Sequence, residues 1–275
     1  MGAGETEFGE QESRLKEKMA KVKHTFIVMS GKGGVGKSTV AVNLAYALSM
    51  TGKKTGILDI DLHGPNIAKM LDIEDRTLFT HESGIEPVEV GENLKVVSIA
   101  LLGHNPDQPI IWRGPAKAGV IRQFLSDVNW GDLDYLIVDS PPGTGDEPLS
   151  ACQLIPEASG IIIVTTPQDV AVLDARKSVV FAREINIPVA GIIENMSGFI
   201  CPHCHVETDI FKRGGGEKAA KELQVPFLGR VPFQPEFVEF GDKGTPFVSF
   251  HHASKSSDAF MGIVGRIQEF IGERE

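Results

Sequence analysis

Hydrophobic residues along the chain form short runs, separated by longer stretches in which they recur at helical spacing. The short runs are nearly continuous Ile, Val and Leu, as is typical of parallel strands buried on both faces of a sheet. In residues 37–50, by contrast, Val40, Leu44 and Leu48 fall on one face of a helix. The predicted strands are residues 25–30, 55–59, 94–100, 135–139, 161–165, 189–194 and 227–231, and the predicted helices are 37–50, 115–128, 168–184 and 256–272.

This alternation of strand and helix predicts an α/β fold, a doubly wound and mostly parallel sheet with helices on both faces. In such a sheet, ligands bind at the carboxyl ends of the strands. Residues 24–275 contain no internal repeat and no long linker, which predicts a single domain. Residues 1–23 alternate acidic and basic side chains with few apolar ones, which predicts a charged tail that is mobile or partly helical.

Composition narrows the classes of function. The formal net charge of −10 argues against DNA or an anionic membrane as the default partner. No apolar run reaches the ~18 residues of a membrane span, and no secretory signal is recognisable near the N-terminus, so we expect a cytoplasmic protein. The chain has 3 cysteines, too few for a disulfide framework, and two of them are close together, which suggests metal or redox chemistry.

A glycine-rich segment between the first predicted strand and the next helix fits the P-loop pattern G-x-x-x-x-G-K-[ST]. Its glycines allow backbone N–H groups to point at phosphate oxygens, and the helix N-terminus adds positive potential. Lys37 is expected to neutralise the β- and γ-phosphates of ATP, and the Ser38 hydroxyl to bind Mg²⁺. The predicted nucleotide-binding residues of this loop are Gly31, Lys32, Gly33, Gly34, Val35, Gly36, Lys37, Ser38 and Thr39.

Lys32 is a second lysine in this loop, which the general pattern does not require. The loop K-G-G-x-G-K-[ST] resembles the deviant Walker A loop of the MinD, ParA and nitrogenase-iron-protein class of ATPases. The resemblance implies a dimer in which Lys32 reaches the nucleotide of the partner subunit; the alternative is a solvated surface lysine.

Three acidic residues lie at the end of a predicted strand or just after it. Asp59 and Asp61 lie on the same side of one strand end, where Asp61 is predicted to orient the attacking water and Asp59 to act near the metal. Asp139 ends a strand of the Walker B type and is predicted to bind Mg²⁺ through water. The turn-rich residues 140–147 that follow are predicted to change conformation when the γ-phosphate leaves, as a switch II segment does. Helix capping and turn formation are the structural alternatives for these acids.

Recognition of the adenine base is less clear from sequence. Asn195 follows the strand at 189–194, where related ATPases place an asparagine against the base. Residues 231–235 are candidates for the same pocket, and loop capping or packing are the alternatives.

Cys201 and Cys204 form a C-x-x-C pair after a buried strand, in a loop predicted at about 196–210. Thiolates at this spacing bind one metal or two corners of an iron–sulfur cluster. A cluster site usually needs four ligands, and a two-fold dimer would supply them by joining two pairs. The alternatives are a zinc site that also uses His203 or His205, and a redox disulfide. Cys152, in a helical pattern, is predicted to be a buried core residue.

Taken in order, these motifs resemble the Mrp/ApbC/Nbp-type iron–sulfur cluster carrier ATPases. The motifs are the loop at 31–39, D-I-D-L-H-G-P-N at 59–66, W-R-G-P at 112–115, the segment 133–146 and E-N-M-S-G-F-I-C-P-H-C at 194–204. The resemblance implies a homodimer that assembles a [4Fe–4S] cluster on paired C-x-x-C motifs, receives it from a donor and passes it to apoproteins, with ATP hydrolysis changing the dimer geometry. Asn66 departs from the expected serine, and residues 1–23 contain no cysteine for an additional cluster.

Two other functions remain open at this point. One is a positioning ATPase similar to MinD or ParA, which would need a basic surface or an amphipathic membrane helix; the acidic C-terminal segment argues against it. The other is an electron-transfer ATPase similar to the nitrogenase iron protein, which takes single, separated cysteines from each subunit rather than a close pair.

Overall fold

The computed structural model describes residues 3–62, 64–103, 114–204, 206–250 and 254–274. The strands are β1 Val22–Met29, β2 Thr55–Asp59, β3 Phe79–His81, β4 Gly84–Glu86, β5 Val88–Val90, β6 Leu94–Ser98, β7 Leu133–Asp139, β8 Gly160–Thr165, β9 Val189–Ile200, β10 Glu207–Thr208 and β11 Phe227–Phe233. The helices are α1 Ala3–Met19, α2 Lys37–Met50, α3 Ile67–Met70, α4 Gly114–Asp127, α5 Asp146–Leu154, α6 Asp169–Glu184, α7 Gly215–Leu223, α8 Glu236–Asp242, α9 Phe247–Phe250 and α10 Lys255–Gly272, with a 3₁₀ turn at Ile99–Leu101.

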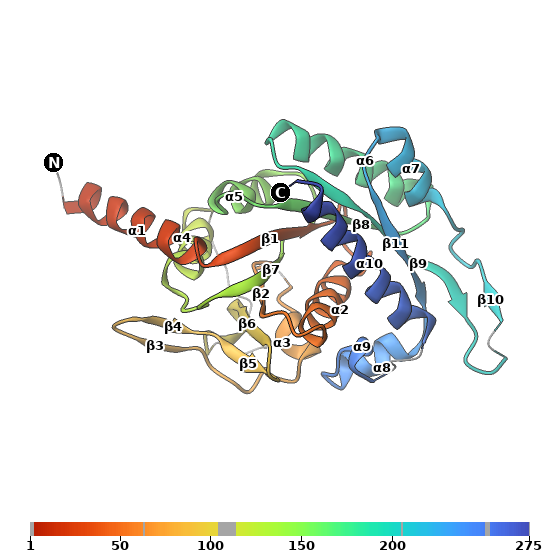
Figure 1. The fold of residues 1–275 in the computed structure, drawn as a ribbon, viewed down its shortest axis with the longest axis horizontal. Coiled ribbons are helices and arrows are strands. Elements are labelled where there is room, and N and C mark those ends of the chain that lie inside the picture. Colours follow the sequence, from red (N-terminus) through yellow and green to blue (C-terminus); the bar gives the residue numbers. More distant parts are fainter. Residues whose placement is uncertain (1–2, 63, 104–113, 205, 251–253, 275) are drawn as a thin grey trace.

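Within the described residues, nine strands form one sheet in the order β10-β9-β8-β1-β7-β2-β6-β5, and β11 also pairs with β9 (Figure 1). The strands from β9 to β6 are parallel, while β5 and β10 run antiparallel to their neighbours. The central strands bury every side chain from Phe26 to Met29 and from Gly160 to Thr165, which explains their unbroken apolar sequences. The predicted doubly wound α/β class is confirmed.

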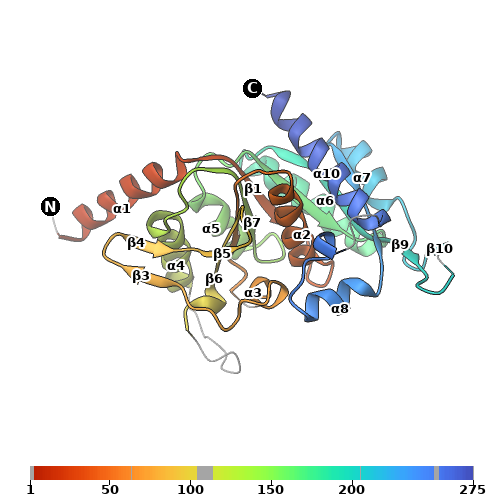
Figure 2. The same ribbon diagram turned by 60° about the horizontal axis from the view of Figure 1, so that its bottom comes forward.

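Helices cover both faces of this sheet. Helices α2 and α10 pack against each other and against strands on one face, and α6 and α7 pack on the other (Figures 1 and 2). Helix α2 is buried around most of its circumference, because the sheet lies on one side of it and α9 and α10 lie on the other. This position fixes the N-terminus of α2 at the carboxyl edge of the sheet, beside the ends of β2 and β7.

The N-terminal segment is partly helical, one of the two alternatives predicted for residues 1–23, but it packs on the domain and its last residues belong to β1. Helix α1 ends at Met19, and β1 begins at Val22 and pairs there with Leu133 of β7. Leu15 and Met19 are buried, and α1 packs against α4. These two apolar side chains anchor the C-terminal half of the helix, an effect that a count of charges does not reveal.

The thiol-bearing segment also differs from the predicted loop at 196–210. Strand β9 continues to Ile200 and pairs there with Glu207 of β10, so Cys201 and Cys204 lie in the turn of a hairpin. In Figures 1 and 2 this β9–β10 hairpin projects from the body of the molecule. The apolar run predicted to end at residue 194 is therefore only the buried part of a longer strand.

Within the parts of the chain that the structure describes, no helix is both long enough and apolar enough to cross a bilayer.

Candidate functional site

The loop between β1 and α2 is tightly wound at the carboxyl edge of the sheet. Gly36 has φ 80°, and a Cβ there would lie 2.3 Å from Asn195 Nδ2. The Ser30 hydroxyl donates to the Lys32 carbonyl at 2.9 Å, which closes the start of the loop. Glycine is thus required at position 36 by both conformation and space. The loop leads directly into the N-terminus of α2, an arrangement suited to binding a phosphate group.

Gly36→Ala is expected to lower the affinity for Mg-ADP by about tenfold or more, because the new methyl group would force the loop away from Asn195. Isothermal titration calorimetry measures the change. Gly265→Ala is the matched control, since position 265 lies in α10 outside the P-loop, has no positive φ, and a Cβ there has no neighbour within 4 Å. Equal losses in the two variants, or no loss in Gly36→Ala, would contradict this prediction.

A buried lysine and three oxygen-bearing side chains meet beside this loop. Lys37 Nζ lies 2.7 Å from Asp139 Oδ1 and 3.4 Å from Asp61 Oδ2. The Ser38 hydroxyl donates to Asp139 Oδ2 at 2.6 Å. The structure therefore brings together Lys37, Ser38, Asp61 and Asp139, four residues that the sequence assigns to one site. Ser38 and Asp139 offer the hard oxygen ligands that Mg²⁺ prefers, so they fit a magnesium site.

Asp59 lies behind this cluster and makes no direct contact with Lys37. Its carboxylate accepts hydrogen bonds from Ser98 Oγ at 2.9 Å and from the Asp61 N–H at 3.1 Å. It stands in register with Asp139 on the neighbouring strand. Burial, and then the charge of Asp139, raise the pKa of Asp59 to about 8, and burial also raises the pKa of Asp139. The sequence did not reveal Ser98 as the hydrogen-bond donor to Asp59, because the contact depends on the pairing of β2 with β6.

Asp59→Asn is expected to raise the melting temperature of the nucleotide-free protein, and to raise it more at pH 8 than at pH 5. The pKa of Asp59 is higher in the folded than in the unfolded protein, so ionisation opposes folding increasingly as the pH rises through this interval. The asparagine stays neutral and can still accept the bond from Ser98. Thermal denaturation at both pH values measures the effect, and a larger stabilisation at pH 5 would contradict it.

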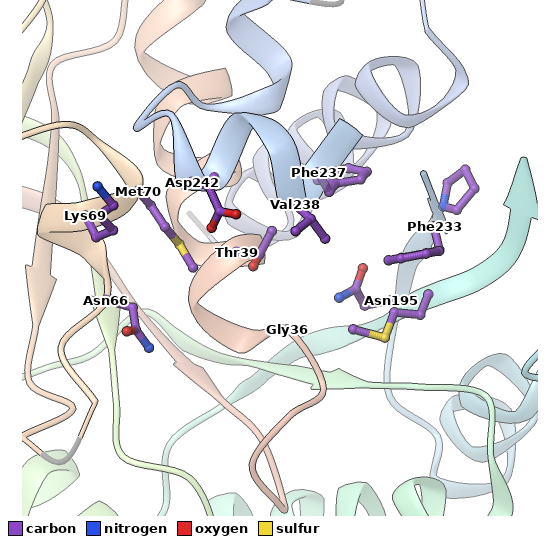
Figure 3. Close-up of a pocket in the computed structure, with 13 residues that line it drawn as sticks. Gly36, Thr39, Asn66, Lys69, Met70, Asn195, Phe233, Phe237, Val238 and Asp242 are labelled. Atoms are coloured by element: carbon purple, nitrogen blue, oxygen red, sulfur yellow. The ribbon is translucent and has the colours of Figure 1, made fainter. Parts of the chain in front are cut away.

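A pocket of about 260 Å³ opens beside the N-terminus of α2. Figure 3 shows Asn195 and Phe233 on one side of it, facing Gly36, with Phe237 and Val238 of α8 nearby. The Asn195 side chain donates to the Val35 carbonyl at 2.9 Å and so joins β9 to the loop. Aromatic and aliphatic walls with one fixed amide suit a planar heterocycle. The complete lining is Gly36, Thr39, Asn66, Lys69, Met70, Asn195, Met196, Pro232, Phe233, Phe237, Val238, Gly241 and Asp242.

Part of this lining was predictable and part was not. Asn195 was predicted, and Pro232 and Phe233 fall within the predicted residues 231–235. The walls formed by α3 and α8 were missed, because these short helices carry no motif and come from distant parts of the chain. A pattern in sequence does not reveal that such segments fold over the same pocket.

Strand β9 is irregular beyond Asn195. Its partner β11 pairs Val231 with Asn195 and Phe233 with Phe199, so β9 has two more residues than β11 over this interval. Within the bulge, Met196 has φ 54° and Gly198 has φ 87°. A left-handed conformation costs a non-glycine residue roughly 1–2 kcal/mol, so the surrounding contacts must hold Met196 in place.

The thiol pair lies at the end of the same strand. Cys201 is partly exposed and Cys204 is exposed, and the Cys201 N–H donates to the Val206 carbonyl at 3.1 Å. Backbone N–H groups of Cys204 and then of His203 lower the pKa of Cys201, which favours the thiolate that binds soft metals. Within the described residues, which omit His205, no three His, Cys, Asp or Glu side chains converge on one point. The pair therefore offers two ligands of a tetrahedral set.

Two further predicted residues lie apart from these groups. Lys32 is partly exposed, and it makes no ion pair with another residue of the described ranges. Its predicted role toward a partner subunit stays a prediction. Cys152 is buried in the core, and burial raises the pKa of its thiol to about 12. Trp112, Arg113 and His63 of the quoted motifs lie outside the described residues.

The fold and the buried lysine–serine–aspartate arrangement define a P-loop NTPase of the MinD and ParA type. MinD from Pyrococcus furiosus has the same fold, with a TM-score of 0.65 and 21% identity, covering 90% of this chain and 99% of that chain. A nucleotide-binding protein from Archaeoglobus fulgidus, solved in complex with ADP, matches with a TM-score of 0.75 and 38% identity. That match covers 84% of this chain and 90% of the other.

A family model described as NUBPL iron-transfer P-loop NTPase matches residues 21–268, and the chain belongs to this family. The iron–sulfur cluster carrier protein of Methanocaldococcus jannaschii is 54% identical over 97% of this chain and 91% of its own length. Its counterpart in Methanococcus maripaludis is 50% identical over 95% of this chain and 90% of its own length. The resemblance drawn from the motifs is confirmed.

Proposed function

We propose that this chain is an ATP-hydrolysing iron–sulfur cluster carrier. Two copies assemble a [4Fe–4S] cluster between their thiol pairs, and ATP hydrolysis controls its release to apoproteins. The observation that carries the proposal is that one strand, β9, connects the two candidate sites. It places Asn195 against the P-loop and, six residues later, presents Cys201 in a hairpin turn.

The nucleotide site is assigned from its polar groups. Lys37 neutralises charge on the β- and γ-phosphates, and Ser38 with Asp139 holds Mg²⁺. Asp61, 3.4 Å from Lys37 Nζ, orients the attacking water toward the γ-phosphate. The pocket beside Asn195 receives the adenine. Lys32, which is partly exposed, supplies a second cation to the nucleotide of the partner subunit.

The cargo site, by which we mean the thiol pair that would bind the iron–sulfur cluster, is assigned from ligand chemistry. Cys201 and Cys204 supply two soft sulfur ligands, and a second copy related by a two-fold axis supplies the other two. The hairpin turn is solvent-exposed, which allows a partner to approach the cluster. The close pair distinguishes this assignment from an electron-transfer ATPase with separated cysteines, and a positioning ATPase has no use for the thiols. A zinc ion in place of the cluster would also use this pair.

Cluster transfer tests the proposal. Anaerobically reconstituted protein is mixed with an apo-ferredoxin in the presence of an iron chelator, with and without Mg-ATP. We expect the acceptor to gain its visible absorption while the chelator stays uncoloured, and the rate to change on addition of Mg-ATP. Iron that passes to the chelator, or a rate that is independent of nucleotide, would contradict the proposal.

A further inference from the structure

A buried glutamate lies in β9, the strand that connects the two candidate sites. Glu194 precedes Asn195 in β9, its side chain is 0% exposed, and the sequence assigned it no role. Its carboxylate accepts the Gly214 N–H at 2.8 Å and the Gly216 N–H at 2.5 Å, at the start of α7. Arg230 Nε lies 3.6 Å away. The helix N-terminus and the guanidinium compensate the buried charge.

The same carboxylate also holds the bulge in β9. The Ser197 hydroxyl donates to Glu194 Oε1 at 2.5 Å, and both side chains are buried. Ser197 lies between Met196 and Gly198, the two residues with positive φ. The bond therefore spans Met196 and holds the first half of the bulge, from which β9 continues to the hairpin.

The two ends of this bulge are tied to different sites. On one end, Asn195 is bonded to the backbone of the P-loop and lines the pocket shown in Figure 3. On the other end, Ile200 leads directly to Cys201. Gly198 has φ 87°, which favours glycine, and its Cα faces the Glu207 side chain of β10, whose Oε1 would lie 2.7 Å from an added Cβ. A displacement of the loop by nucleotide is transmitted along this path only if the bulge moves as one body.

We infer that Glu194 and Ser197 are positioning residues, which hold the β9 bulge rigid so that nucleotide bound at the P-loop changes the exposure of the Cys201–Cys204 turn. The inference rests on the proposed nucleotide site, and it goes beyond the proposed function by naming the contact that couples the two sites. Neither residue lines the pocket beside the P-loop, and neither belongs to the Cys201–Cys204 turn. A purely structural role, as a cap for α7, predicts instead a loss of stability without a loss of coupling.

Thiol alkylation of the full chain without cluster tests the coupling. The rate at which iodoacetamide modifies Cys201 and Cys204 is followed by peptide mass spectrometry, with Mg-ADP, with a non-hydrolysable Mg-ATP analogue and with neither. In the wild type we expect nucleotide to change the rate by about fivefold. In Ser197→Ala we expect nucleotide affinity to stay within about threefold of wild type while the nucleotide effect on the rate is lost. Cys152 is the internal control, because it is buried and should stay unmodified.

Two further variants make the outcome decisive. Ser126→Ala removes another fully buried hydroxyl, on α4, and should keep the wild-type response. Glu194→Gln tests the other partner of the bond, and it replaces Ser197→Ala in the assay if that variant fails to fold. A nucleotide response that persists in folded Ser197→Ala and Glu194→Gln, or that is absent in the wild type, overturns the inference. So does a Ser197→Ala protein that no longer binds nucleotide.

Cluster uptake is measured separately in the same preparations, so that the two proposals fail in different ways. Wild-type protein that takes up no cluster but shows the expected alkylation pattern leaves the coupling intact and removes the cargo assignment. Normal cluster uptake, together with a wild-type effect of nucleotide on alkylation in the variants, removes the coupling and leaves the cargo assignment intact.

Discussion

Lys37→Ala is expected to lower the rate of ATP hydrolysis by about 100-fold or more. The lysine is 6% exposed, and it is the cation placed to stabilise charge that develops on the transferred phosphoryl group in a site largely shielded from water. Release of inorganic phosphate at saturating Mg-ATP measures the loss. The conclusion requires folded protein, which circular dichroism confirms in the same samples, because the change also leaves buried Asp139 without its nearest cation.

Lys16→Ala is the matched control for this prediction. Lys16 lies on α1 and forms an exposed ion pair with Glu12, so its removal should leave the rate unchanged. A Lys37→Ala protein that is folded and hydrolyses ATP at close to the wild-type rate would show that the P-loop lysine is not part of the reaction.

The double variant Cys201→Ser/Cys204→Ser is expected to retain less than about a tenth of the wild-type iron and acid-labile sulfide after anaerobic reconstitution, because hydroxyl oxygen is a poor ligand for the soft iron–sulfur core. Cys152→Ala controls for the loss of a thiol as such, since Cys152 is buried and should not bind cluster. His203→Ala distinguishes a cluster from zinc bound with histidine, and it should bind as much iron as the wild type. Equal uptake by the double variant and the wild type would remove the cargo site from this hairpin.

The strands and helices that could be predicted from the sequence are the buried ones. Strand β2 and helix α2 match the predicted ranges, because every residue of β2 is buried and α2 follows the unmistakable P-loop pattern. The site residues Lys37, Ser38 and Asp139 could be predicted for a related reason. The P-loop pattern indicates Lys37 and Ser38, and the Walker B pattern indicates Asp139. The structure brings them together because the carboxyl ends of parallel strands meet at one edge of the sheet.

The remaining features depend on contacts that have no local pattern. Strand β9 continues beyond its apolar run through Met196 and Gly198, because Glu194 and β11 hold the irregular residues in place. Ser98 reaches Asp59 only through the pairing of two strands, and α8 reaches the pocket only through the packing of the C-terminal segment. Each of these arises from tertiary structure, so neither hydrophobic spacing nor motif matching could have revealed it.

Native mass spectrometry of the anaerobically reconstituted protein, combined with iron and sulfide analysis, tests the central claim most directly. The claim is that two copies of the chain share one cluster through Cys201 and Cys204. We predict a species of two chains carrying four iron and four sulfide, with the visible absorption of a [4Fe–4S] cluster. A monomer that retains its full complement of metal would contradict the account.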